Sequence, residues 1–146
     1  MRGYVDLSFL GHLLLQSRRT AEANALLRRV ELPLALNDLH ELQVENLFQH
    51  LALSGERGAA AVLRARRSWQ SWLAEMVFLH RDAGWSGNFA AAHRLCRIHT
   101  SPDLTPVGFL HVAAAVSSRA DALLSYDAPV RVLAKSQGLA VLPQRL

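Results

Sequence analysis

The chain alternates between short apolar runs and longer segments in which apolar residues recur at helical spacing. The short runs have the length and the polar flanks that are typical of buried strands. They lie at Met1 to Asp6, Leu32 to Leu36, Ala122 to Ser125 and Leu139 to Leu142. Because strands that alternate with helices form parallel sheets covered on both faces, we predict one domain over residues 1–146. Its expected fold is α/β, a three-layer α/β/α sandwich with a short parallel sheet.

Capping residues indicate where the helices between these strands begin and end. Ser8 is expected to cap the first helix, and Thr20 to begin a second one that includes Val30. Residues 58–100, rich in Ala, Arg and Trp, are predicted to be helical with a break near residues 84–87. Asn37 or Asp38 should cap a helix that runs to about Leu53 and stops at Ser54-Gly55. Another helix should start at Thr105-Pro106. Asp127 should cap a helix that ends before Gly138.

An aromatic stripe lies in the long helical segment. Trp69, Trp72 and Met76 are spaced as i, i+3 and i+7, which places them on one face of a helix. Such a stripe forms either part of the core or a dimer interface more often than a platform for stacked bases. We therefore hypothesise a homodimer formed through apolar helix faces.

Composition and charge narrow the classes of partner and compartment. The 146 residues are 51% hydrophobic, and 16 basic against 12 acidic residues give a net charge of +4. This excess suits a polyanion or an acidic protein partner. Cys96 is the single cysteine, so neither an internal disulfide nor a thiolate zinc cluster can form, and a cytoplasmic location is expected. No apolar run approaches the roughly 20 residues that cross a bilayer, so we expect no membrane association.

Two aspartates stand directly at the ends of predicted strands. In parallel α/β sheets the ligand crevice lies outside the carboxyl ends of the strands, and Asp6 and Asp127 should both face it. A helix cap explains Asp127 as well as a metal site does. A site role explains Asp6 better, because an unpaired carboxylate is costly to bury.

Several segments also share the order and spacing of a known family. Tyr4-Val5-Asp6-Leu7-Ser8 ends a strand in an acid followed by a hydroxyl residue. The other matching segments are Leu39-His40 with Asn46, His99-Thr100, Phe109-Leu110-His111-Val112-Ala113-Ala114-Ala115, Ala120 to Asp127 and Gly138-Leu139-Ala140-Val141. Together they cover the chain nearly end to end and resemble PIN domains of the VapC toxin type.

The resemblance implies a site, a cofactor and partners. In that family four acidic side chains hold Mg²⁺ or Mn²⁺ for the hydrolysis of RNA, and a small antitoxin protein neutralises each toxin. Hard cations prefer anionic oxygen ligands, and paired metals activate water in phosphodiester hydrolysis. Carried over to this chain, the first and last acidic positions are Asp6 and Asp127, with Ser8 and Ser125 as supporting residues.

The other two acidic positions depart from the family pattern. The position three residues before Asn46 is Gln43, and the position three residues before His111 is Gly108. Gln43 keeps an oxygen that can bind a metal, whereas Gly108 keeps nothing. Since an acid in the first helical turn suits the helix dipole, we expect Gly108→Asp to leave stability unchanged.

Neighbouring acids are not expected to replace the missing ones. At about 100° of rotation per residue, Glu41 and Glu45 lie roughly 160° around the helix from Gln43. Asp103 precedes the Thr105 helix start, and Asp121 belongs to another family position. His111 is expected to be a hydrogen-bonded core residue.

Two function classes follow from this mixed pattern. One is a Mg²⁺-dependent endoribonuclease toxin that uses Asp6, Gln43 and Asp127, with single-stranded or structured RNA as its substrate. The other is a binding module that keeps RNA or antitoxin binding without cleavage. A small-molecule enzyme on a Rossmann-like sheet is disfavoured, because no Gly-rich phosphate loop follows Asp6.

Overall fold

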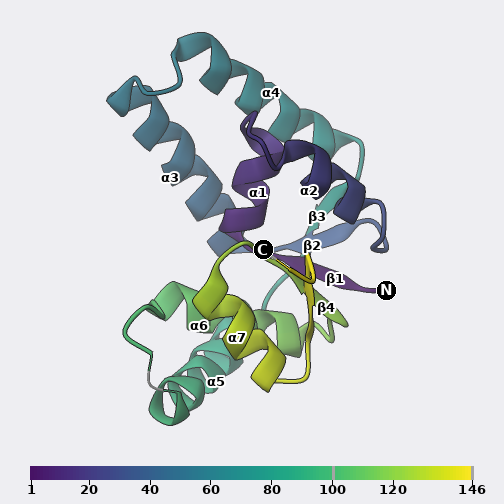
Figure 1. The fold of residues 1–146 in the computed structure, drawn as a ribbon, viewed down its shortest axis with the longest axis vertical. Coiled ribbons are helices and arrows are strands. Elements are labelled where there is room, and N and C mark those ends of the chain that lie inside the picture. Colours follow the sequence, from purple (N-terminus) through teal and green to yellow (C-terminus); the bar gives the residue numbers. More distant parts are fainter. Residues whose placement is uncertain (100, 146) are drawn as a thin grey trace.

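Short parallel strands lie between two groups of helices in the computed structural model, which describes residues 1–99 and 101–145 (Figure 1). Three strands form one sheet in the order β1 (Gly3–Val5), β4 (Ala122–Leu124) and β5 (Ala140–Leu142), and β2 (Leu34–Leu36) pairs with β3 (Phe78–His80). Every pairing is parallel. The predicted three-layer α/β/α fold is therefore confirmed.

In the part of the chain that the structure describes, seven helices cover the strands on two sides. On one side lie α1 (Leu7–Leu14), α2 (Thr20–Leu27), α3 (Asp38–Ser54) and α4 (Ala59–Ala74), and on the other lie α5 (Trp85–Ile98), α6 (Pro106–Ser117) and α7 (Ala128–Ser136) (Figure 1). Successive strand residues point to opposite faces. Val5 and Leu124 accordingly pack into the core under α1 to α4, while Tyr4 and Leu123 pack into the core under α5 to α7.

Local capping chemistry sets most helix ends where the sequence predicts them. Asn37 caps α3 through a reciprocal pair of contacts with His40, and Gly55 ends it with a left-handed φ of 69°. Thr105 caps α6, with Pro106 at its first position. Asp127 caps α7 through the N–H of Val130.

The predicted cap of the first helix is wrong by two residues. Asp6 caps α1, because its carboxylate accepts a hydrogen bond from the Phe9 N–H. The Ser8 hydroxyl instead donates to Asp6 and accepts from the N–H of Tyr126. Both residues are good caps by type, and only the point at which β1 ends decides between them.

Two other predicted segments also need correction. Residues 58–100 were expected to be helical, but β3 interrupts them. This strand places the buried ring of Phe78 against Trp69 and Trp72 of α4. Thr100, where that segment and the predicted His99-Thr100 loop end, lies outside the described residues. The second helix ends at Leu27, so Val30 is beyond it.

Two residues of the aromatic stripe are partly buried and pack against the core of this chain, whereas Met76 is exposed. Trp69 and Trp72 pack against Phe78, with ring centroids 5.7 and 5.9 Å away. Met76 lies beyond the end of α4. These contacts show core packing for part of the stripe, and the homodimer stays a prediction.

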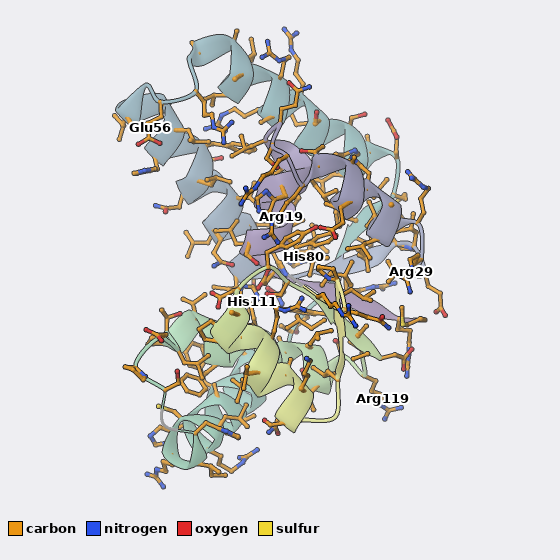
Figure 2. All side chains as sticks on the ribbon, viewed as in Figure 1. Arg19, Arg29, Glu56, His80, His111 and Arg119 are labelled. Carbon is orange, nitrogen blue, oxygen red and sulfur yellow. The ribbon has the colours of Figure 1, made fainter. Side chains whose placement is uncertain are left out.

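The outer surface carries much of the positive charge. Figure 2 shows Arg29 and Arg119 pointing outward, while His111 lies between the two groups of helices. Across residues 1–99 and 101–145, no helix has both the length and the apolar character needed to span a membrane.

Candidate functional site

A cleft of about 460 Å³ opens where β1 and β4 end. Its lining includes Asp6, Gln43, Gly108 and Asp127, the four positions that the resemblance assigns to metal-binding acids. These residues come from the end of β1, from α3, from the first turn of α6 and from the start of α7. The fold thus brings together residues that are up to 121 positions apart in the sequence (127 − 6).

Asp6 is buried and held by the protein itself. Its side chain accepts hydrogen bonds from Ser8 Oγ at 2.6 Å, from the Phe9 N–H at 3.0 Å and from Ser125 Oγ at 2.5 Å. Val5 pairs with Leu124 in the sheet, so Asp6 and Ser125 are the next residues on adjacent strands. Burial raises the pKa of Asp6, and these hydrogen bonds oppose the rise.

Ser8 and Ser125, the two predicted supporting residues, are both hydrogen-bonded to Asp6. Ser8 also lines the cleft, whereas Ser125 is fully buried behind it. The Ser125 hydroxyl additionally accepts a hydrogen bond from the Asp127 N–H at 3.0 Å. The Ser125 hydroxyl therefore links the Asp6 carboxylate, which follows β1, to the backbone N–H of Asp127, which follows β4.

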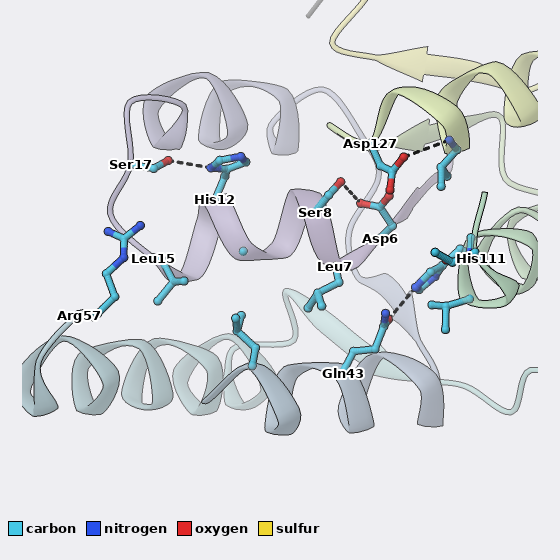
Figure 3. A pocket seen from close by; sticks show the side chains of 16 residues that line it. Asp6, Leu7, Ser8, His12, Leu15, Ser17, Gln43, Arg57, His111 and Asp127 are labelled. Atoms are coloured by element: carbon cyan, nitrogen blue, oxygen red, sulfur yellow. Dashed lines mark hydrogen bonds between the residues drawn. The ribbon is translucent and has the colours of Figure 1, made fainter. Parts of the chain in front are cut away.

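Asp127 is exposed, caps α7 and lines the cleft. Its Oδ1 accepts a hydrogen bond from the Val130 N–H at 3.3 Å, so it caps α7. The same side chain lines the cleft, and Figure 3 shows it at the same end as Asp6. Asp6 and Asp127 are the two carboxylates in the lining of the cleft.

Gln43 reaches the cleft from α3 and meets His111 of α6. Gln43 Oε1 and His111 Nε2 are 2.6 Å apart (Figure 3), and His111 Nδ1 lies 3.2 Å from the hydroxyl of Tyr4. Burial lowers the pKa of His111 to about 4, so the ring is neutral near pH 7. The predicted hydrogen-bonded core role of His111 is confirmed, and the residue also lines the cleft.

Gly108 occupies its predicted place in the cleft but has little room for a side chain. A Cβ atom there would lie 3.0 Å from Cγ2 of Val130, a buried residue of α7. The expectation that Gly108→Asp costs no stability therefore depends on a shift of Val130 by a few tenths of an ångström. Packing against α7 thus opposes the favourable dipole at this position.

The opposite end of the cleft is basic, which the sequence patterns did not reveal. His12 and Arg57 line it (Figure 3), and Arg57 is anchored by a 3.0 Å hydrogen bond from its guanidinium to the Gln16 carbonyl. Burial lowers the pKa of His12, and Arg19, Arg18 and Arg57 lower it further. His12 could have been found four residues after Ser8 on the same helical face, but Arg57 has no local sequence signal.

The neighbouring acids that were not expected to replace the missing carboxylates do not line the cleft. Glu45 forms a salt bridge with Arg66, with Oε1 2.8 Å from a guanidinium nitrogen. Asp121 forms another with Arg2, at 2.9 Å. Neither Glu41 nor Asp103 lines the cleft.

A second group of side chains could hold a metal ion. The ligand atoms of Asp38, Glu41 and His80 lie within 4.8 Å of one another, and all three residues are exposed. His80 Nε2 is 3.0 Å from one Asp38 oxygen, and the Trp85 indole N–H donates to the other at 2.9 Å. This group belongs to the start of α3 and the end of β3, and it is separate from the cleft.

No model of a known protein family matches the sequence, and no curated protein is significantly similar to it.

Proposed function

We propose that the protein is a PIN-like RNA-binding domain related to VapC-type toxins, in which metal-dependent RNA cleavage is weak. The observation that supports this best is that Asp6, Gln43, Gly108 and Asp127 line one cleft. These positions were selected from sequence motifs alone, on four separate segments. A chance resemblance gives no reason for them to meet at the carboxyl ends of β1 and β4.

Weak cleavage follows from the charge that remains in the cleft. Affinity for Mg²⁺ depends on the number of anionic oxygen ligands, and the cleft retains Asp6 and Asp127. Asp6 is 3% exposed and already accepts three hydrogen bonds from the protein. Most of the lone pairs of the Asp6 carboxylate that a metal ion would need are therefore already used in hydrogen bonds within the protein.

RNA binding is supported by the basic end of the same cleft. Arg57 presents a guanidinium whose position is fixed by the Gln16 carbonyl, and His12 lies nearby. The chain carries a net charge of +4, and a cationic surface attracts the phosphate backbone by releasing its counterions. Arginine suits this role because its planar fork donates to two phosphate oxygens at once.

The test uses the full chain and a fluorescein-labelled single-stranded RNA. Fluorescence anisotropy measured over a range of salt concentrations should show binding that weakens as salt rises. Arg57→Gln should weaken binding, whereas Arg29→Gln, a change at an exposed arginine outside the cleft, should not. Cleavage of the same RNA is measured with Mg²⁺ and with Mn²⁺.

Two results would overturn the proposal. Equal effects of Arg57→Gln and Arg29→Gln would show that binding does not use the cleft. Cleavage by the unchanged protein at about 1 s⁻¹ or faster, abolished by Asp127→Asn, would show that the two carboxylates suffice for an active nuclease.

A further inference from the structure

A chain of buried hydrogen bonds runs from the start of α3 to the cleft, and its direction is set at its first member. Asn37 is 4% exposed, and its Oδ1 accepts from the backbone N–H groups of Leu39 at 3.1 Å and His40 at 3.3 Å. Because a backbone N–H can only donate, Oδ1 must face the helix. The Asn37 Nδ2 group therefore faces Tyr4 and donates to its hydroxyl oxygen at 3.2 Å.

The next step passes through the hydroxyl of Tyr4, which is 2% exposed. Its oxygen already accepts from Asn37, and the hydroxyl hydrogen needs an acceptor of its own. His111 Nδ1, 3.2 Å away, is the acceptor that the described part of the chain provides. Burial also raises the pKa of Tyr4, which keeps the hydroxyl protonated. His111 Nδ1 must then be without a proton.

The proton of the neutral His111 ring is consequently on Nε2. Nε2 lies 2.6 Å from Gln43 Oε1 and donates to it. This contact assigns the amide oxygen of Gln43 to His111, on the side of the buried chain. The remaining polar group of Gln43 is its Nε2 amide, which has no protein hydrogen-bond partner among residues 1–99 and 101–145.

We infer that Gln43 donates hydrogen bonds into the cleft through its amide N–H groups, and that this position binds a phosphate oxygen of the RNA rather than a metal ion. An amide nitrogen has no lone pair for a cation, and the amide oxygen is already used by His111. A glutamate at position 43, held by the same hydrogen bond from His111, would leave its second carboxylate oxygen facing the cleft. Residue 43 thus decides whether this part of the cleft receives an anion or a cation.

The identity of the ligand rests on the proposed function, but the direction of the hydrogen-bond chain does not. Long-range ¹H–¹⁵N correlation spectra of the full chain identify the tautomer of His111. We expect the Nε2–H form in the unchanged protein. The Nδ1–H form, or a charged ring near pH 7, would overturn the inference whether or not the protein binds RNA.

The ligand class is tested with dimethyl phosphate, a simple phosphodiester, and with Mg²⁺. The side-chain amide signals of Gln43, assigned by their loss in Gln43→Glu, should shift with dimethyl phosphate and remain unchanged with Mg²⁺. Gln43→Glu should weaken dimethyl phosphate binding about tenfold or more. Gln70→Glu, which changes an exposed glutamine of α4 outside the cleft, should not.

The opposite pattern, with Gln43 signals that shift with Mg²⁺ and not with dimethyl phosphate, would overturn the inference. If His111 has the Nε2–H form and dimethyl phosphate binds, but labelled RNA does not, the donor role of Gln43 stands and the proposed RNA-binding function fails. The two proposals are therefore tested separately.

Discussion

Gln43 and His111 are 68 residues apart in the chain, yet their side chains meet at 2.6 Å between Oε1 and Nε2. The contact joins α3 to α6 across the cleft and continues inward through Tyr4 and Asn37. A buried polar chain of this kind is favourable only while every member has a partner. Two buried histidines, His111 and His40 at the start of α3, must stay neutral in this arrangement, so the fold is sensitive to acid.

We expect stability to fall with pH below about 6.5. Burial lowers the pKa of His40 to about 3 and that of His111 to about 4, so both are neutral in the fold, whereas in the unfolded chain histidines titrate near 6.5. As pH falls, the unfolded state takes up protons that the folded state does not. Each histidine should remove about 1.4 kcal/mol of unfolding free energy per pH unit in this window.

Asp6 has the opposite sign and reduces the effect. Its pKa is raised in the fold, so the stability linked to it is greatest at low pH and is lost as pH rises through its folded pKa. Urea unfolding at several pH values between about 4.5 and 7.5 measures the sum. His111→Gln should flatten the slope, and His93→Ala, at a position outside this buried chain, should not. A free energy of unfolding that is constant over this range would contradict the prediction.

Gly108 and Val130 should be energetically coupled. Gly108→Ala places a Cβ about where the structure leaves 3.0 Å to Val130 Cγ2, and crowding of this kind costs about 1–3 kcal/mol. Val130→Ala removes the crowding methyl groups, so Gly108→Ala should cost less in that background. A double-mutant cycle measured by urea unfolding checks this. Purely additive effects of the two changes would show that Val130 does not limit residue 108.

Restoring both acids should create a metal site. Gln43→Glu with Gly108→Asp adds two negative charges to the cleft, and Val130→Ala provides the room that the new aspartate side chain needs. We expect the triple variant to bind Mn²⁺ about tenfold or more tighter than Val130→Ala alone, since hard cations follow ligand charge. Mn²⁺ titration measures the affinity, and cleavage of labelled RNA measures any gain in activity. Equal Mn²⁺ affinity in the two variants would count against the degenerate-site interpretation.

Asp6 should matter more for folding than Asp127 does. Asp6→Ala leaves Ser8, Ser125 and the Phe9 N–H without their acceptor, at a cost of about 2–4 kcal/mol. Asp127→Ala removes an exposed cap and should cost about 1 kcal/mol. Thermal and urea unfolding compare the two changes. A smaller loss for Asp6→Ala than for Asp127→Ala would contradict the hydrogen-bonding role assigned to Asp6.

Asn is the more informative replacement at position 6. Asp6→Asn removes a carboxyl group whose pKa burial raises, but keeps an oxygen that accepts from the protein. Its cost should therefore be well below that of Asp6→Ala. For activity assays, Asp127→Asn is the cleaner change, because the exposed cap survives it.

Local chemistry written into the sequence determined the helix caps, the order of the apolar runs that form strands and the parallel α/β class. Asn37, Gly55, Thr105 and Asp127 act within one helical turn, so their effect does not depend on distant residues. The strand β3 was missed because no glycine or proline between Ala74 and Phe78 marks the end of the preceding helix. In the fold, β3 pairs with β2, and Phe78 packs against Trp69 and Trp72.

The chemistry of the cleft, in contrast, was decided by tertiary contacts. The sequence placed Asp6 and Asp127 at strand ends, and it indicated that Gln43 and Gly108 stand where acids are expected. It did not show that Val130 of α7 fills the space beside Gly108, or that His111 engages the Gln43 oxygen. These contacts join elements far apart in the chain, and their geometry depends on how α3, α6 and α7 pack, which no spacing within a single segment encodes.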